Sequence, residues 1–359
     1  MSPLSSPVPL SVLDLAPVSS GSTTRQALRN TIALAQHAEA LGYHRYWLAE
    51  HHNMPGIASS SPAVLIGQVA AATSTLRVGS GGVMLPNHPP LVVAEQFGML
   101  TALYPERIDL GLGRAPGTDP RTAAALRRSA APLSADDFPQ QLGELINYFI
   151  EDPAAYGNGQ LHAVPAAGNQ PTIWLLGSSD YSARLAGMLG MPFAFAHHFS
   201  SANTLPAARA YRDNFSPSAA LDEPYLMIAA SVLAAEDDER ARYLAAPGGL
   251  SFLRLRQGRP GPVPSPEETA AYEYTDIERL IIEDRMSGQI IGGPETVRRG
   301  VSELLAATGA SELMVTTQAH DPADRLRSYE LLAGLWPNRS TGESTDQQPG
   351  EAEVTPARS

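Results

Sequence analysis

Four short segments carry the residue types that do chemistry in enzymes: Glu50-His51-His52, Gly111-Leu-Gly-Arg114, Gly177-Ser178-Ser179 and His197-His198. A neutral histidine can act as a general base near pH 7. An arginine can hold a phosphate through two parallel hydrogen bonds, and a glycine-serine turn can offer backbone N–H groups to an anion. These residues therefore point to phosphate binding and proton transfer.

The segment Gly177-Ser178-Ser179 stands between an apolar run and a helical pattern. A small turn in this place presents the N–H groups of a helix N-terminus, to which serine hydroxyls add. An ordinary serine N-cap is the competing explanation. Spacing excludes two other sites, because a nucleophile elbow needs glycine where Tyr181 stands and a dinucleotide fingerprint starting at Gly111 needs glycine where Pro116 stands.

Arg114 and the pair Gly81-Gly82 are further candidates for ligand contact. Arg114 follows Gly-Leu-Gly, so its guanidinium could hold a phosphate bidentately, although a surface salt bridge would also explain an isolated arginine. Gly81-Gly82 ends another apolar run. There the backbone either passes close to a flat group or forms a bulge.

The adjacent histidines His51 and His52 have three interpretations. Strand alternation would turn their rings to opposite sides. One of them could be a general base, or a metal site could form with His197 or His198. We predict no metal, because barrel metallohydrolases usually carry His-x-His at a strand end and none of the nine histidines has that spacing.

A regular alternation of strands and helices must position these candidates. Short apolar runs predict eight strands, and helical periodicity predicts a helix after each of them. The expected strands are 10–14, 45–49, 76–81, 107–112, 172–176, 193–197, 225–234 and 312–317. The expected helices are 24–41, 61–73, 89–103, 136–149, 180–189, 203–214, 294–308 and 322–335. The fold class is therefore α/β, a (β/α)8 TIM barrel with inserted loops, whose strand ends bring the candidates to one mouth.

Two stretches exceed what a barrel needs, one near 113–135 and one near 236–291. Long excursions after barrel strands are usually lids or binding loops, with a partner-facing insertion as the alternative. We expect one domain over residues 1–337 and a disordered tail over 338–359, which has no aromatic residue, leucine or isoleucine.

Composition removes several classes of protein. The 359 residues include no cysteine, and all 25 basic residues are arginine, because lysine is absent. Disulfides, cysteine-ligated metals, Schiff-base lysines and P-loops are therefore excluded. A net charge of -12 argues against nucleic acid or an anionic membrane as partner. The N-terminal residues lack the pattern of a secretory signal and no apolar run is long enough to span a bilayer, so we expect a cytoplasmic protein.

Residues 49–117, which begin AEHHNMPG and end LGLGRAPG, closely resemble the bacterial-luciferase-like flavin-dependent monooxygenases. The segments Gly177-Ser-Ser-x-x-Ser182 and IIGGPETV near the C-terminus extend the likeness over nearly the whole barrel. Within the family, the chain is most similar to bacterial oxidoreductases that are not light emitters.

The resemblance implies a luciferase-like barrel that takes reduced FMN from a separate flavin reductase and uses O2 to oxidise a small organic substrate. Arg114 and the loop of Gly177, Ser178, Ser179 and Ser182 would bind the FMN phosphate. His51 would be the base or hydrogen-bond donor near the flavin, with His52 as the second catalytic candidate. Gly81-Gly82 would match the family's non-prolyl cis peptide under the flavin ring.

One residue departs from the pattern of true luciferases, in which a cysteine precedes the arginine. Gly113 stands there, which removes a reactive thiol and argues against luminescence. The resemblance also implies a homodimer. We expect its interface at helix 61–73, although burial of that helix within its own barrel is an equal alternative.

Three other functions remain open from the sequence. A deazaflavin-dependent oxidoreductase of the same superfamily would transfer hydride without oxygen, and a non-catalytic flavin-binding protein would not turn over at all. A metallohydrolase is a third alternative. The substrate is not identified, and its determinants are expected in the two excursions.

Overall fold

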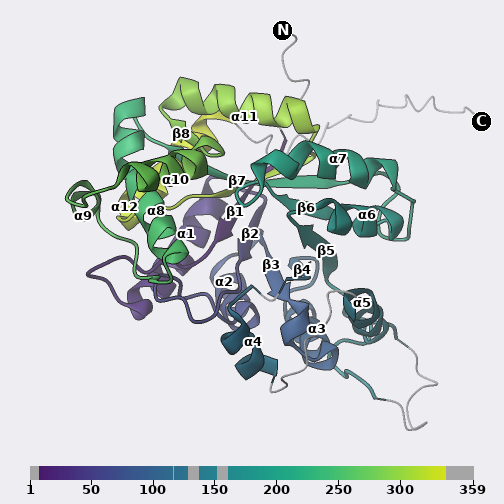
Figure 1. Ribbon diagram of the computed structural model, residues 1–359. Helices are drawn as coiled ribbons and strands as arrows, with labels where there is room; N and C mark the ends of the chain where they lie inside the picture. Colours follow the sequence, from purple (N-terminus) through teal and green to yellow (C-terminus); the bar gives the residue numbers. More distant parts are fainter. Residues whose placement is uncertain (1–7, 116, 128–136, 152–160, 337–359) are drawn as a thin grey trace, which may run out of the picture.

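The computed structural model describes residues 8–115, 117–127, 137–151 and 161–336, and its centre is a closed barrel of parallel strands (Figure 1). The barrel strands are β1 (Leu10–Asp14), β2 (Arg45–Leu48), β3 (Arg77–Met84), β4 (Ile108–Gly113), β5 (Thr172–Gly177), β6 (Phe193–Ala196), β7 (Leu226–Ala234) and β9 (Glu312–Thr316). Neighbours pair in chain order, and β9 closes the ring between β7 and β1. The predicted (β/α)8 fold is confirmed, with each expected strand present.

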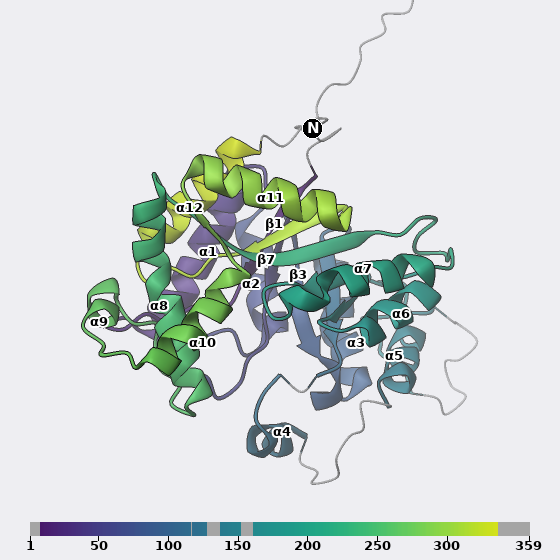
Figure 2. The same cartoon turned by 45° about the horizontal axis from the view of Figure 1, so that its top comes forward.

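Helices surround the barrel on its outside (Figure 2). They are α1 (Thr24–Ala40), α2 (Pro62–Ala72), α3 (Pro90–Leu103), α5 (Phe138–Asn147), α6 (Asp180–Met188), α7 (Thr204–Asp213), α11 (Pro294–Thr308) and α12 (Pro322–Leu335). Local sequence fixes several starts: the Thr23 side chain accepts a hydrogen bond from the Gln26 N–H, and the Asp321 side chain accepts one from the Ala323 N–H. Among the described residues, no helix combines the length and apolar character that a membrane span requires.

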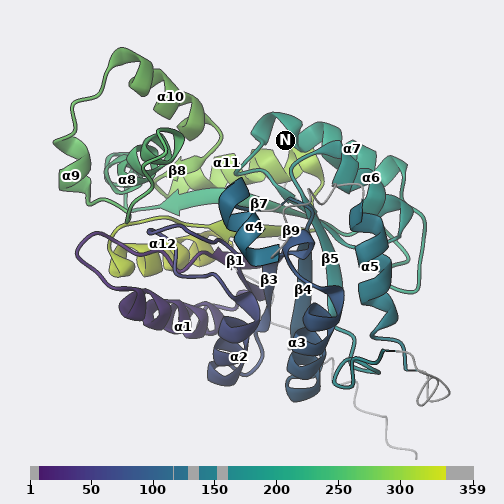
Figure 3. The ribbon, with the colours of Figure 1, turned by 60° about the horizontal axis from the view of Figure 1, so that its bottom comes forward.

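The two excursions form structure of their own. The first contains α4 (Pro120–Arg127), and its remaining residues 128–135 lie outside the described part. The second contains α8 (Asp238–Arg256), α9 (Pro266–Ala270) and α10 (Asp276–Ser287), which stand as a group at one side of the barrel (Figure 3). A short strand that the sequence did not predict, β8 (Ile290–Gly292), follows and pairs with β7. The expected tail over 338–359 also lies outside the described residues.

Inside the barrel, charged residues occupy the amino-terminal end. Arg45 donates from Nε to both oxygens of Glu312 at 3.0 Å and from one terminal nitrogen to Asp109 at 2.9 Å. Arg77 reaches the other oxygen of Asp109. Burial alone would raise the pKa of Asp109, but Arg45 and Arg77 lower it overall, so the carboxylate stays charged.

The side chains become smaller toward the carboxyl end. Trp47 and Trp174 pack edge to face in the middle of the barrel, with their ring centroids 5.2 Å apart. Above them, the inward-facing positions are taken by small residues such as Ala49, Gly113 and Ala229. The charged end and the tryptophans thus fill the lower barrel, and the inner side chains above them include small residues together with Leu176.

Candidate functional site

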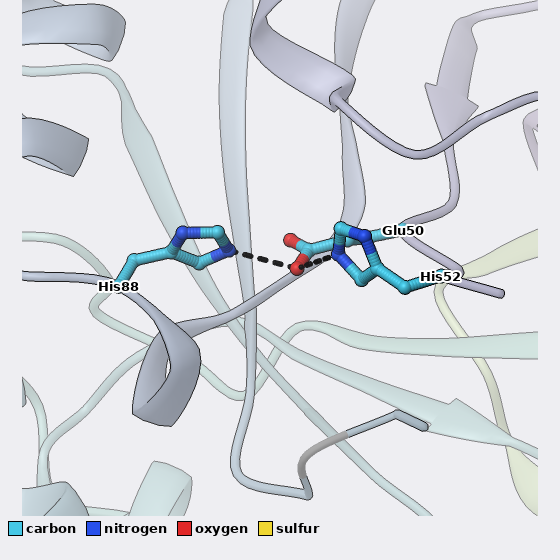
Figure 4. A group of neighbouring side chains, drawn as sticks. All are labelled: Glu50, His52 and His88. Carbon is cyan, nitrogen blue, oxygen red and sulfur yellow. Dashed lines mark hydrogen bonds and ion pairs between the residues drawn. The ribbon is translucent and has the colours of Figure 1, made fainter. Parts of the chain in front are cut away.

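Glu50, just after β2, links two loops at the carboxyl end of the barrel (Figure 4). One of its oxygens, Oε1, accepts hydrogen bonds from His52 Nε2 at 2.9 Å and from His88 Nε2 at 2.8 Å. The other oxygen, Oε2, accepts one from the Met84 backbone N–H at 3.1 Å. Burial alone would raise the pKa of Glu50, but the bonds from His88, His52 and Met84 lower it overall. A buried, charged carboxylate therefore ties the loop after β2 to the loop after β3.

The same three side chains could in principle bind a metal ion. Within the described residues, their ligand atoms form a group of His and acid side chains in which all lie within 4.8 Å of one another. The short N–H to oxygen distances are those of hydrogen bonds. These bonds account for the arrangement, and we therefore build no mechanism on a metal. The metal site considered from the sequence included His197 or His198, and neither of them belongs to this group.

His51 lies next to Glu50 but has different partners from His52. Its backbone N–H donates to the Ser59 carbonyl at 3.0 Å, and the residue makes a hydrogen bond with the backbone of Gly117. Burial lowers the pKa of His51, although the bond with Gly117 acts in the opposite direction. Because the pKa lies below its usual value of 6.5, the ring is mainly neutral at pH 7 and can accept a proton.

Arg114 and the loop after β5 meet at the start of α6. The Arg114 guanidinium lies over the ring of Tyr181, 4.3 Å from its centroid, and Tyr181 is in the first turn of α6. Ser179 is the N-cap of this helix, yet its side chain makes no capping hydrogen bond. The ordinary cap that competed with the anion-site interpretation is thus not formed, and a guanidinium lies beside a helix N-terminus.

The serine loop itself is tightly folded. A Cβ atom added to Gly177 would lie 2.5 Å from the Cβ of Ser182, so this turn requires glycine. Ser182 is buried, while Ser178 is exposed. One residue opposes anion binding here: Asp180 is acidic in the first turn of α6, although it pairs with Arg184 at 3.0 Å. Both the arginine and the loop are present where the sequence predicted them.

The peptide bond between Gly81 and Gly82 is cis, as the resemblance implied, and the register between β3 and β4 shifts between Gly81 and Val83. The register shift agrees with the bulge interpretation of the glycine pair, and contact with a flat group stays a prediction. On the neighbouring strand, a Cβ at Gly113 would lie 2.8 Å from the Cε of Met84. The Met84 thioether therefore occupies the space that a side chain at position 113 would need.

His197 and His198 follow β6 and are oriented differently. His197 Nδ1 bonds to the Thr204 hydroxyl at 2.7 Å. His198 is buried, and its Nδ1–H donates to the Ala229 carbonyl at 2.8 Å. Burial lowers the pKa of His198 to about 4, with smaller contributions from Arg285 and from His51. His198 is therefore neutral and lies close enough to His51 for the two rings to interact electrostatically.

Sequence reasoning missed His88 and Arg285 as parts of this region. His88 stands in Asn87-His-Pro-Pro90 just before α3, and only its contact with Glu50 reveals a function. Arg285 is one of many arginines in the second excursion, and no local pattern separates it from the others. A search for histidines immediately after other strands could have found His88.

Comparison of the sequence with known proteins gives consistent results. The sequence pattern of luciferase-like monooxygenases matches residues 8–312. A protein of Escherichia coli (strain K12) named luciferase-like monooxygenase is 47% identical over 325 residues, covering 90% of this chain and 96% of that protein. N-acetyl-S-alkylcysteine monooxygenase of Bacillus subtilis (strain 168) is 35% identical over 329 residues, covering 90% of this chain and 97% of that protein.

Solved structures agree with the sequence comparison. The crystal structure of apo-MsnO8 has a TM-score of 0.83 and 38% identity, covering 91% of this chain and 98% of that one. The oxygenating constituent of 3,6-diketocamphane monooxygenase from Pseudomonas putida, in complex with FMN, has a TM-score of 0.67 at 21% identity, covering 91% and 97% of the two chains. An F420-dependent secondary alcohol dehydrogenase has a TM-score of 0.63 at 14% identity, covering 92% and 100%. At the last two identities only the fold is shared.

Proposed function

The chain belongs to the family of luciferase-like monooxygenases, and from this premise we propose that it uses reduced FMN and O2 to oxidise a small organic substrate. Reduced FMN, when bound, supplies the two electrons that allow one oxygen atom to enter the substrate while the other leaves as water. A separate flavin reductase provides the reduced cofactor. The protein's own residues bind the cofactor, exclude water from the site and hold the proton that is transferred during the reaction.

The observation that carries the cofactor proposal is the position of Arg114 beside the N-terminus of α6. A phosphate placed there would meet a guanidinium, uncapped N–H groups of the helix and the hydroxyls of Ser178, Ser179 and Ser182. With no lysine in the chain, the charge that neutralises a phosphate must come from arginine. The cis peptide joins Gly81 and Gly82, which have no side chains of their own, at the end of β3 that faces the mouth.

We assign the proton-transfer role to His51. Its ring is mainly neutral at pH 7, because burial lowers its pKa, and it belongs to the loop that Glu50 fixes to β3. His52 instead donates to Glu50, so we assign it to holding that carboxylate in place. This division gives the two histidines predicted as catalytic different roles: one moves a proton and the other positions the loop.

Binding and turnover of the purified protein test the proposal. Anaerobic titration with reduced FMN, and in parallel with reduced deazaflavin, measures which cofactor binds. We expect saturable binding of FMN and, with a flavin reductase and NADH added, oxygen consumption above the rate of the reductase alone. Saturation by the deazaflavin without FMN binding would instead indicate an F420-type oxidoreductase, the fold of which this chain shares. FMN binding without substrate oxidation would indicate a non-catalytic flavin protein.

The His51→Ala variant tests the proton-transfer role separately from binding. N-acetyl-S-methylcysteine serves as the probe substrate, because one relative is named for this class of thioether. We expect product formation to slow by about 10²-fold or more while FMN affinity is unchanged. His52→Ala is the comparison variant. It removes the hydrogen bond to Glu50 and should change the position of the loop after β2, while the His51 ring remains. Normal turnover in the His51 variant would contradict the assignment.

We also propose a homodimer that forms through α2 and α3. Most of the apolar side chains of α2 pack within the barrel, but Val64 remains 68% exposed. On α3, Met99 and Leu103 are 53% and 64% exposed. Exposed apolar side chains on two helices that contact each other favour contact with a second copy. A Leu103→Glu substitution should shift the mass measured by light scattering toward the monomer, and an unchanged mass would contradict this interface.

A further inference from the structure

The second excursion brings a cation, Arg285 of α10, to the carboxyl end of β6. The terminal nitrogen NH1 of Arg285 donates a hydrogen bond to the carbonyl of His198. Its guanidinium also lies over the ring of Phe252 of α8, 5.1 Å from the centroid. The side chain is half-buried between the excursion and the barrel. A positive charge is therefore held firmly at the end where the candidate site lies.

Arg285 has no negatively charged partner among the residues that the structure describes. Burial lowers the pKa of Arg285, and no carboxylate there raises it again. The buried arginines Arg45 and Arg325 differ, since each forms an ion pair with an aspartate. Burying a charge without a partner costs free energy. A guanidinium has five N–H donors, and the bond to His198 uses only one of its nitrogens, so further donors remain for another group.

The two groups that contact the Arg285 guanidinium, the His198 carbonyl and the Phe252 ring, carry no negative charge. His198 is neutral, and its tautomer is fixed because Nδ1–H donates to the Ala229 carbonyl. His198 interacts electrostatically with both Arg285 and His51, so the three groups occupy one region of the mouth. Phe252 adds an apolar wall beside the guanidinium. The region thus combines a positive charge, an apolar surface and a neutral base, and such a combination attracts a small organic anion.

We propose that Arg285 binds the carboxylate of the substrate, and that the enzyme therefore prefers small organic acids with an apolar body. This inference rests on the proposed monooxygenase function. The planar fork of a guanidinium matches a carboxylate through two parallel hydrogen bonds. The second excursion, in which sequence reasoning placed the substrate determinants, supplies this arginine. The proposed function assigns the FMN phosphate, a second possible anion, to Arg114 after β4, and β5 separates that strand from β6, so the experiment distinguishes the two sites.

Binding of phenylacetate and of uncharged phenylacetamide tests the inference, because the two probes differ only in the carboxylate. Isothermal titration of each probe is done with the protein in the presence and in the absence of FMN. The variants are Arg285→Gln, which keeps an N–H donor for the His198 carbonyl, and Arg285→Lys, which keeps the charge. Arg256→Gln is the matched control, since Arg256 is exposed and lies over the same Phe252 ring.

We expect phenylacetate to bind the wild-type protein more tightly than phenylacetamide does. Arg285→Gln should weaken phenylacetate by about tenfold or more, as expected for a lost charge-assisted pair, and leave phenylacetamide and FMN unchanged. Arg285→Lys should recover part of the loss, and Arg256→Gln should have no effect. Equal affinity of the two probes for the wild type, or unchanged phenylacetate affinity in Arg285→Gln, would overturn the inference. Loss of FMN affinity in that variant would assign the phosphate to Arg285 instead.

Failure of the proposed function gives a different result. If FMN does not bind the wild-type protein, the monooxygenase proposal is wrong. The discrimination between phenylacetate and phenylacetamide can still be measured without FMN, so the carboxylate site is judged independently. Circular dichroism of each variant shows whether the fold is retained, and only folded variants are compared.

Discussion

Two groups of arginines differ in their partners, one inside the amino-terminal end of the barrel and one at its mouth. At the amino-terminal end, Arg45 is buried and bonded to the carboxylates of Asp109 and Glu312. At the carboxyl end, Arg114 and Arg285 lie over the aromatic rings of Tyr181 and Phe252, and neither forms an ion pair within the described residues. The amino-terminal cluster of Arg45 satisfies its charges internally, while Arg114 and Arg285 keep donors available for a ligand.

This difference separates stability from function within one fold. Barrel strands run parallel, so each contributes one end to the closed, charged layer and the other to the mouth. Trp47 and Trp174 fill the barrel between the two layers. Substitution of Arg45 at the amino-terminal end should therefore change the free energy of unfolding without changing cofactor affinity, and substitution of Arg114 at the mouth should do the reverse.

Arg45→Met should have the largest effect. It leaves Glu312 and Asp109 buried with fewer partners, and breaking a buried ion pair typically costs about 3–5 kcal/mol of folding free energy. Chemical denaturation of the apoprotein measures the loss. FMN affinity of the folded fraction should be unchanged.

Arg298→Met is the control for that substitution, because Arg298 forms an exposed pair with Glu295 on α11 and should cost only about 0–1 kcal/mol. If the two variants lost similar amounts of stability, the amino-terminal cluster would not be the stabilising layer that its burial indicates.

The groups at the two ends of the barrel should also lose their contributions to the free energy of unfolding at different pH values. His198 has a pKa of about 4 in the folded protein, against the ordinary 6.5, because it is buried. Between pH 4 and 6.5, His198 therefore binds a proton in the unfolded chain but not in the folded protein. The stabilisation is complete above pH 6.5 and declines as the pH falls to 4, by about 3 kcal/mol at most. Asp109, whose pKa is lowered, loses its contribution only at lower pH.

Denaturation at a series of pH values checks this order. In His198→Asn, whose side-chain amide can still donate to the Ala229 carbonyl, unfolding free energy should vary less between pH 6.5 and 4 than in the wild type. His51 and His197 also have pKa values lowered by burial, so some dependence should remain. An unchanged slope in the variant would show that His198 is not the main acid-sensitive group at the mouth.

Arg114→Ala should weaken FMN binding by about 1.5–3 kcal/mol, the worth of a charge-assisted hydrogen bond. Fluorescence titration with FMN measures the change, and added salt should reduce the difference between variant and wild type. Arg327→Ala is the control, since Arg327 is an exposed arginine paired with Glu236 and Glu330. Equal affinity of the Arg114 variant and the wild type would place the phosphate elsewhere.

The sequence predicted the mouth of the barrel better than the contacts within it. Strand ends can be located because apolar runs stop at polar residues, and so His51, Arg114 and the serine loop were placed correctly at one end. The different hydrogen-bond partners of His51 and His52 could not be predicted, since they depend on Glu50, which also binds His88 from another loop. The charged layer was also missed, because Arg45 and Glu312 are 267 residues apart in the chain.

Ser178→Ala should have the smallest effect of the substitutions at the mouth. Ser178 is exposed in the loop that leads into α6, and one neutral hydroxyl contributes about 0.5–1.5 kcal/mol to a hydrogen-bonded site. FMN affinity should therefore fall by less than in Arg114→Ala, while stability remains as in the wild type. Ser287→Ala, in which the lost hydroxyl donates to a carbonyl on α10, is the control and should leave FMN affinity unchanged. A loss in Ser178→Ala as large as that in Arg114→Ala would mean that the loop, rather than the arginine, supplies most of the phosphate's binding free energy.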